Sequence, residues 1–468
     1  MTSMHYRGPD GSGIWSDEKV VLGHVRLSIL GINNGAQPII DSLNGLALSC
    51  NGEIYNYRAL KEDLIDDGYQ FQTDSDSEVI LGIYQKHGLN FITKLRGMFA
   101  FCLWDQKSQR LICARDYTGQ KPLYFANAQG GIVISSELKG IKDHFLQNDE
   151  IKLNHKVLNS TFRQSYSLGL DETYIEQINK VQPGQLLVIE NNQVTKKEYW
   201  SSRSSTNVTR LNKGIYKSET LKILRESVDI HMQSDVPVAV LLSGGIDSSA
   251  IACLAKECRE EVHAITVGYS EKKSPHDERE LAKRLSREKG LTWHEIELDS
   301  IDYSQYFQEY IKVLDEPNGD IASFAQWGIY KKAKELGFKV LLSGNGGDEI
   351  FYGYPLHTKN GEALSTIKKL KRFLPMNRRN KSFRLIKHCV LNFRNILHAL
   401  RYYIPEGQAE IFNKENASFK DQYLVPSNYF SPSVDDVFEV YTYLLNIWLP
   451  NNCYLLADKL AMGNSVEV

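Results

Sequence analysis

The stretch VPVAVLLSGGIDSSAIACLAKE, residues 236–257, decides the fold of the second half of this chain. An apolar strand runs into a Gly-Gly turn and then into a helix. Glycines let the backbone approach an anion closely, and a helix N-terminus presents free N–H groups and the positive end of its dipole. Asp247 places an acid inside this anion-binding turn, as expected if it holds Mg²⁺ between phosphates. Without a lysine the turn is not a Walker A loop. We therefore predict a different kind of ATP-binding loop at Ser243–Ser249.

A second glycine-rich turn follows a strand in KVLLSGNGGDEIFYGY, residues 339–354. Between the two motifs, helix-like stretches alternate with short apolar strands, which is typical of a parallel sheet covered on both faces. Four strands are expected, at 238–242, 263–267, 294–298 and 339–342. Ligands bind at the carboxyl ends of such strands, where both motifs lie. The sequence thus predicts one nucleotide site built from both turns.

The first half of the chain has a different pattern. A length of 468 residues favours two domains. Residues 1–200 are rich in short apolar runs separated by turn residues, with helices expected at 57–66 and 76–87. The polar stretch 201–214 is the predicted linker, and 215–468 is the predicted second domain.

Composition and charge exclude several classes of function. The net charge of −2 gives no general attraction to nucleic acid or to an anionic membrane, and no apolar run is long enough to span a bilayer. The seven cysteines are scattered, which favours a reducing, cytoplasmic location over a zinc site or a disulfide framework. Residues 359–401 hold twelve Lys or Arg and one acid, and are either a solvated helical face or a docking surface for an anionic partner.

Taken together, the motifs resemble the asparagine synthetase B family. SDVPVAVLLSGGIDSS (234–249) is followed by SGxGxDExFxGY, with DEPNGD (315–320) and LADKLAMGNSVEV (456–468) as further landmarks. In the first half, HYRGPDGSG, HVRLSI, NGEIYNY, SDSE, LRGMFAF and RDYTGQKPLY occur in the family's order. The resemblance implies an α/β plus α+β two-domain protein. Its first domain would be an Ntn-type glutaminase β-sandwich with flanking helices, and its second a doubly wound parallel sheet of the ATP-pyrophosphatase type.

The resemblance also implies roles for individual residues of the second half. ATP and Mg²⁺ are the expected cofactors, and Asp247 and Asp348 are the expected metal ligands. The residues implied to hold ATP are Leu242, Ser243, Gly244, Gly245, Asp247, Ser248, Val267, Ser343, Gly344 and Asp348. A substrate carboxylate would attack the α-phosphorus of ATP to give an acyl-adenylate, and ammonia would then displace AMP.

For the first half, the resemblance implies a glutamine site. Arg26 would bind the carboxylate of glutamine, for which its planar fork is suited. Glu53 and Asp76 would bind the α-amino group. Asn51 and the N–H of Gly52 would form the oxyanion hole.

Both ends of the sequence depart from the family pattern. Family glutaminases use an N-terminal cysteine whose own amine is the base, whereas this chain begins MTS and soon reaches HYRGPDG. Thr2 and Ser3 are poor substitutes, and Cys50 is expected to be a buried core thiol. The family pattern also continues beyond SVEV with a lysine that serves adenylation. The interpretation is a chain truncated at both ends, without glutaminase activity and with weak or no ammonia-dependent activity.

A third departure concerns the acceptor. Relatives that amidate aspartate usually have an acid where this chain has Asn345. One hypothesis is therefore asparagine synthesis from aspartate, ATP and glutamine or ammonia. A second is amidation of another carboxylate, such as a sugar acid or a peptide, and a third is an inactive protein that still binds ATP or glutamine. A homodimer is the usual oligomer of such soluble proteins.

Overall fold

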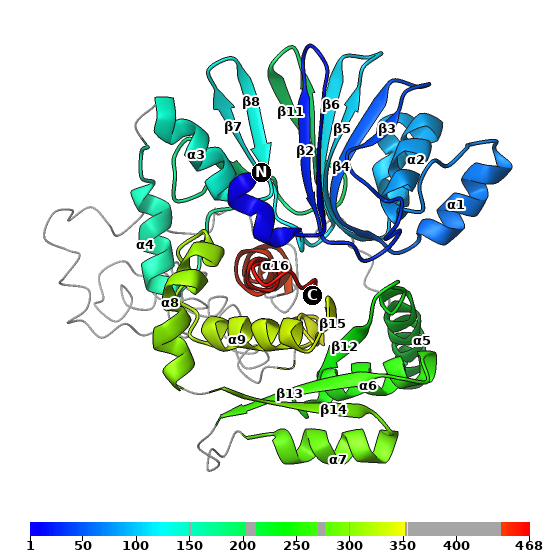
Figure 1. The fold of residues 1–468 in the computed structure, drawn as a ribbon, viewed down its shortest axis with the longest axis vertical. Coiled ribbons are helices and arrows are strands. Elements are labelled where there is room, and N and C mark those ends of the chain that lie inside the picture. The colour runs from blue at the N-terminus through cyan, green and yellow to red at the C-terminus, as the bar shows by residue number, and fades with distance from the viewer. Residues whose placement is uncertain (149–150, 203–211, 270–276, 299, 352, 354–440) are drawn as a thin grey trace, which may run out of the picture.

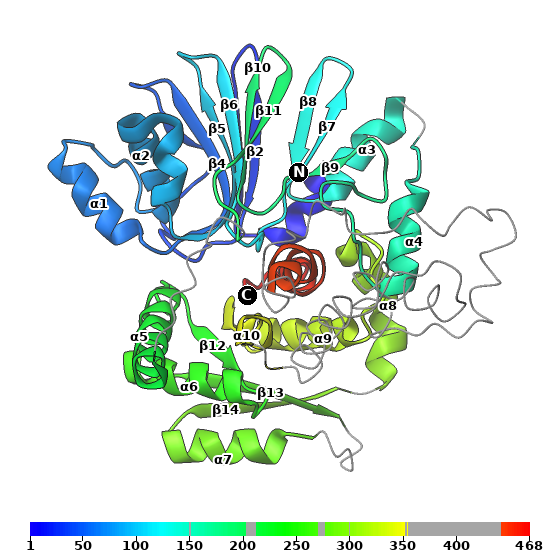
Figure 2. The same cartoon turned by 180° about the vertical axis from the view of Figure 1, so that it is seen from behind.

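The computed structural model describes residues 1–468 except 149–150, 203–211, 270–276, 299, 352 and 354–440. The N-terminal half forms β-sheets flanked by helices, and the C-terminal half forms a parallel sheet with helices on both faces (Figure 1). Helix α16, Tyr454–Met462, lies between the two halves in both views (Figures 1 and 2). The basic segment 359–401 and most of the predicted linker lie outside the described residues.

The N-terminal domain contains a six-stranded sheet, a three-stranded sheet and a two-stranded hairpin. The larger sheet has the order β11-β10-β6-β5-β4-β3, in which every pair is antiparallel. Its strands are β3 (Ile39–Asp41), β4 (Leu46–Ile54), β5 (Gly97–Asp105), β6 (Arg110–Arg115), β10 (Gln185–Glu190) and β11 (Gln193–Glu198). The three-stranded sheet joins β8 (Gly131–Ser135), β7 (Tyr124–Ala128) and β9 (Asn179–Lys180), and the hairpin joins β1 (Gly11–Ser16) and β2 (Val21–Arg26).

The alternation of side chains along these strands builds a core on each face of the sheet. Leu48 of β4 and Phe101 of β5 pack against helices α1 (Tyr57–Asp66) and α2 (Val79–His87). On the opposite face, Leu187 of β10 and Phe125 of β7 share a second core between the two sheets. The predicted sandwich with flanking helices is therefore confirmed.

The remaining N-terminal helices are short. They are η1 (Thr2–Arg7), η2 (Asp76–Glu78), η3 (Gly88–Lys94), α3 (Leu138–Asn148) and α4 (His155–Gln164). The helix predicted at 57–66 is confirmed as α1. The one predicted at 76–87 begins with the tighter turn η2, where the Ser75 side chain accepts a hydrogen bond from the N–H of Ser77.

The C-terminal domain has a four-stranded parallel sheet in the order β14-β13-β12-β15. Its strands are β12 (Val238–Leu241), β13 (His263–Tyr269), β14 (Thr292–Leu298) and β15 (Val340–Leu342). All four predicted strands are thereby confirmed. One face carries α5 (Lys213–His231), α6 (Ile246–Cys258) and α7 (Arg279–Lys289), and the other carries α8 (Ser300–Leu314), α9 (Ala322–Glu335) and α16. This is the doubly wound arrangement that the sequence predicts.

The end of the chain returns to this sheet. The short helix α10 (Gly347–Phe351) follows β15, and the π-helical segment η5 (Leu444–Cys453) leads into α16. After α16, Glu467 pairs in parallel with Val340 of β15: its N–H donates to the carbonyl of Lys339 at 2.7 Å, and its carbonyl accepts from Leu341 at 2.9 Å. Among the helices described, none is both long and apolar enough to cross a membrane.

Candidate functional sites

The first predicted nucleotide loop is a compact turn held by its own serines. The hydroxyls of Ser243 and Ser248 lie 3.0 Å apart, and the hydroxyl of Ser248 accepts from the N–H of Ser243 at 3.2 Å. The N–H of Gly245 donates to the Ser243 hydroxyl at 3.1 Å. The turn follows β12 and opens helix α6 at Ile246, so its N–H groups lie at a helix N-terminus. This geometry suits an anion.

The second loop packs directly against the first. A Cβ added at Gly347 would lie 2.4 Å from Oδ2 of Asp247, and one added at Gly344 would lie 3.4 Å from the backbone nitrogen of Ser248. At Gly347 a side chain would collide with the Asp247 carboxylate as it is now placed, whereas at Gly344 the fit is merely tight. The structure thus brings together the polar residues that the sequence assigns to phosphate and metal, from the ends of neighbouring strands β12 and β15.

The predicted metal ligands are Asp247 and Asp348, each in the first turn of its helix. Burial, and then the like charge of Asp348, raises the pKa of Asp247. A divalent cation between these carboxylates would remove that repulsion. In the part of the chain that the structure describes, no cluster of three or more His, Cys, Asp or Glu could hold a metal. Two carboxylates suit a Mg²⁺ whose other ligands are phosphate oxygens and water.

The two apolar residues assigned to ATP are arranged differently. Leu242 is 1 % exposed and packs with helices on the α6 face, whereas Val267 packs on the α9 face. The Leu242 N–H donates to the carbonyl of Ile265, and its carbonyl accepts from the hydroxyl of Thr266, both at 2.8 Å. Leu242 therefore anchors the start of the loop to strand β13. Its contact with the adenine side of ATP remains a prediction.

The residues assigned to glutamine line one small cavity of about 60 Å³ in the N-terminal domain. They are Arg26, Asn51, Gly52, Glu53 and Asp76. Nη2 of Arg26 donates to the carbonyls of Leu30 and Gly31 at 2.8 Å, which fixes the guanidinium beside the cavity. The side-chain nitrogen of Asn51 and Oε1 of Glu53 are buried and have no hydrogen-bond partner among the residues that the structure describes. A donor and an acceptor are thus left for a polar ligand.

Gly52 can only be a glycine at this position. Its φ is +131°, and an added Cβ would lie 2.0 Å from the carbonyl oxygen of Met98 on the neighbouring strand β5. The unusual backbone conformation lies within β4, beside Asn51, where the oxyanion hole is predicted. Such local strain is kept where the surrounding sheet imposes it.

Two buried acids share the cavity. Burial raises the pKa of Asp76 to about 6, although Asp76 accepts from the N–H of Ile54 at 2.6 Å. Burial, and then the charges of Asp76 and Glu467, raises the pKa of Glu53 well above its usual value. Both carboxylates would be favoured in their charged form by a bound ammonium group.

Of the candidate nucleophiles that the sequence discounts, Cys50 lines the glutamine pocket but has an unreactive thiol, and Ser3 does not line that pocket. Cys50 is buried, as predicted, and burial raises the pKa of its thiol to about 12. Its N–H and carbonyl are held by the side chain of Gln37 at 2.7 and 3.0 Å. Ser3 lines a different cavity from the glutamine pocket.

That other cavity lies between the domains and measures about 960 Å³. Its wall includes residues 315–319 of the DEPNGD motif together with parts of η1, α3 and α8. Asp315 accepts from the N–H groups of Leu138 and Lys139 at 2.6 and 3.0 Å, and its Oδ2 lies 2.9 Å from Nζ of Lys459. The motif thus ties the second domain to the start of α3.

Among the residues of the glutamine pocket that the sequence does not predict, two come from the C-terminal domain. Met462 and Glu467 come from the far end of the chain and line the cavity beside the strand β4 residues. They belong to the motif LADKLAMGNSVEV. The motif is recognisable in the sequence, but its contact with the glutamine pocket is not.

Comparisons with known proteins assign each half of the chain to a family. Residues 1–200 match a family model described as glutamine amidotransferase domain, and residues 219–468 match one described as asparagine synthase. Over 488 positions the chain is 33 % identical to asparagine synthetase [glutamine-hydrolyzing] 1 of Bacillus subtilis strain 168, covering 99 % of this chain and 74 % of the relative. It is 32 % identical to putative asparagine synthetase [glutamine-hydrolyzing] 2 of Methanocaldococcus jannaschii, covering 80 % and 75 %. It is also 31 % identical to amidase chry2 of Gibberella zeae, covering 75 % and 54 %.

Proposed function

Because the chain belongs to the asparagine synthase family, we propose that it forms a carboxamide from a carboxylate, ATP and ammonia. Its N-terminal domain would bind glutamine as the nitrogen donor, whose hydrolysis needs a nucleophile that neither Cys50 nor Ser3 supplies. The observation that carries the proposal is the contact between the two loops of the C-terminal domain, in which Asp247 lies against Gly347 and faces the charge of Asp348. Two acids at two helix N-termini, next to the hydroxyls of Ser243 and Ser248, suit a magnesium-bound polyphosphate.

The reaction proceeds in two balanced steps. An oxygen of the acceptor carboxylate attacks the α-phosphorus of ATP, the α–β bond breaks, and pyrophosphate leaves. Ammonia then attacks the carbonyl carbon of the acyl-adenylate, AMP leaves, and a proton is released. Ser243, Ser248 and the N–H groups of the α6 turn would orient the phosphates, and Asp247 and Asp348 would hold Mg²⁺, which neutralises phosphate charge.

The N-terminal pocket supports glutamine as the nitrogen donor. Arg26 offers a guanidinium for a carboxylate, and Glu53 and Asp76 offer carboxylates for an ammonium. The unpaired amide nitrogen of Asn51 and the backbone at Gly52 offer donors for an amide oxygen. A small cavity with these three kinds of group is complementary to a free amino acid that carries a side-chain amide.

Aspartate is the acceptor we favour, because two of the three relatives named above are asparagine synthetases, whereas the third is an amidase. The second candidate is another carboxylate. Asn345 is exposed in the second loop and its N–H donates to the Ser343 hydroxyl at 3.5 Å, so an uncharged side chain stands where an acid is usual.

An isotope experiment tests the proposal. The purified chain is incubated with MgATP, ammonium chloride and aspartate whose side-chain carboxylate carries ¹⁸O. Transfer of one ¹⁸O to AMP, with pyrophosphate in equal amount, is the expected result. A panel of other labelled carboxylates run in parallel identifies the second candidate. Release of ADP and unlabelled phosphate, or no cleavage of ATP with any acceptor, contradicts the proposal.

A further inference from the structure

Glu467 contacts both domains, through its backbone in one and its side chain in the other. Its backbone extends the parallel sheet, with hydrogen bonds to Lys339 and Leu341 on either side of Val340. Strand β15 ends at Leu342, and the second nucleotide loop begins at the next residue. Any displacement of the Glu467 backbone therefore acts on the strand that carries this loop.

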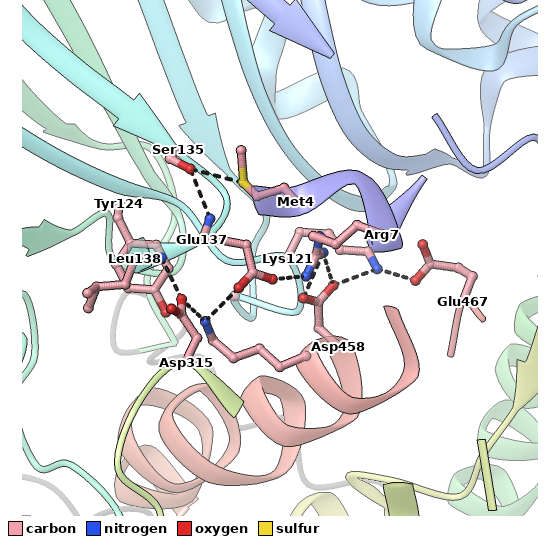
Figure 3. Close-up of polar contacts among 12 residues, drawn as sticks. Met4, Arg7, Lys121, Tyr124, Ser135, Glu137, Leu138, Asp315, Asp458 and Glu467 are labelled. Atoms are coloured by element: carbon pink, nitrogen blue, oxygen red, sulfur yellow. Dashed lines mark hydrogen bonds and ion pairs between the residues drawn. The ribbon is translucent and has the colours of Figure 1, made fainter. Parts of the chain in front are cut away.

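The side chain of Glu467 points the other way, into the N-terminal domain. Glu467 is 4 % exposed, and Oε1 forms an ion pair with Nζ of Lys121. Figure 3 shows Lys121, Arg7 and Glu137 of the N-terminal domain meeting Asp458 and Glu467 of the C-terminal domain. Lys121 also pairs with Asp458 of α16 at 3.0 Å.

The same side of Glu467 forms a wall of the glutamine pocket. Glu53, Asp76 and Glu467 all line this cavity, so three acids converge on it. Lys121 is the cation that counters the charges of both Glu53 and Glu467. A ligand ammonium placed beside Glu53 would relieve the repulsion between Glu53 and Glu467. It would also change how strongly Lys121 is attracted to each of these two carboxylates.

We propose that Glu467 is a positioning residue that couples occupancy of the glutamine pocket to the nucleotide loop at Ser343–Asp348, through its ion pair with Lys121 and its backbone pairing with β15. The inference rests on the proposed function, since it needs glutamine in one site and ATP in the other. Coupling of this kind is reciprocal, so each ligand changes the affinity for the other by the same factor.

Titration calorimetry tests the coupling. The Kd of MgATP is measured with and without saturating L-glutamine, and the Kd of L-glutamine with and without MgATP. In the wild-type chain we expect glutamine to tighten MgATP binding by at least about fivefold, with the same factor in the reciprocal titration. In E467Q we expect this factor to fall to within about twofold of unity, while MgATP alone binds within about threefold of wild type.

A matched control is E226Q. Glu226 of α5 forms an ion pair with Arg96 of the N-terminal domain, but this pair is exposed and neither residue lines the pocket. E226Q should keep the wild-type coupling factor. A wild-type factor of one, or an unchanged factor in E467Q, overturns the inference. Absence of MgATP or glutamine binding to the wild type instead overturns the proposed function.

Hydrogen–deuterium exchange of the wild-type chain provides a test that needs no variant. The N–H groups of Leu341 and Glu467 form the backbone link between the two sites. L-glutamine should slow exchange at both by at least about threefold. Slower exchange at Gly52 and Glu53 with no change at Leu341 and Glu467 overturns the coupling even if E467Q does not fold.

Discussion

A Cβ at Gly347 would lie 2.4 Å from Oδ2 and 2.7 Å from Cγ of Asp247, so the two loops of the nucleotide site fit together only with glycine at this position. This contact connects the turn after β12, which carries Asp247, to the turn after β15, which carries Gly347. It places an acid from one loop at the N-terminus of the helix that follows the other.

The variant G347A should therefore weaken MgATP binding by at least about tenfold, or about 1.4 kcal/mol, because the Asp247 carboxylate must move away. Calorimetric titration measures the affinity. G214A, in the first turn of the exposed helix α5, is the matched control and should bind as the wild type does. Equal affinities for G347A and the wild type would show that the loop contact plays no part in nucleotide binding.

The glutamine pocket should respond to pH. The pKa of Asp76 is raised from 3.8 to about 6 by burial, so the empty pocket takes up a proton there as the pH falls through 6. A bound ammonium favours the charged carboxylate. Protonation of Asp76 should thus lower the affinity for L-glutamine as the pH falls below 6, by up to about tenfold per pH unit. Titrations between pH 5 and 7.5 measure this slope.

The raised pKa of Asp76 affects the stability of the fold in the opposite direction, since it favours the folded state at low pH. Since the folded state holds the Asp76 proton more tightly than the unfolded state does, this residue makes the free energy of unfolding decrease as the pH rises between 3.8 and 6. D76N should reduce the pH dependence of glutamine affinity and of the free energy of unfolding, and should weaken glutamine binding at pH 7.5. The exposed D66N should leave both pH dependences unchanged. Glutamine affinity independent of pH in the wild type would contradict the assignment of Asp76.

The buried charges between the domains should matter far more than the exposed ones. Arg7 pairs with Glu137 at 2.6 Å and with Asp458 at 2.8 Å, and all three side chains are at most 4 % exposed. R7M removes the cation that pairs with the buried carboxylates of Glu137 and Asp458. The free energy of unfolding should therefore fall by about 3–5 kcal/mol.

R96M provides the control, because it removes an exposed ion pair across the same boundary and should cost less than about 1 kcal/mol. Urea denaturation followed by circular dichroism measures both. A loss for R7M as small as that for R96M would mean that water reaches the charges in Figure 3.

Local pattern was enough to predict much of the fold. The short apolar runs of β4 and β5, the helical spacing at 57–66 and the buried strands at 238–242 and 339–342 are all recognisable from neighbouring residues alone. Strand β11 was not predicted, because its sequence QVTKKE is charged. Charged residues are usual on an edge strand, which pairs on one side only.

The polar residues of both sites could also be located, because each set lies in recognisable motifs. The nucleotide loops follow strands β12 and β15, and Asn51, Gly52 and Glu53 lie within β4. The contribution of Met462 and Glu467 to the glutamine pocket could not, since it depends on α16 lying between the domains. Neither periodicity nor turn chemistry reports a contact such as Lys121 with Asp458, which is separated by 337 positions. Only the packed structure places these residues together.

The most direct test of the account is the affinity of the wild type and of the double variant D247N/D348N for ATP, measured by calorimetry with Mg²⁺ and with EDTA. The two carboxylates are the groups to which we assign the metal, so the wild type should bind MgATP at one site and bind at least about tenfold more weakly in EDTA. The double variant should lose this dependence on Mg²⁺ and bind MgATP at least about tenfold more weakly than the wild type. Equal affinity of both proteins for MgATP would contradict the assignment of this site.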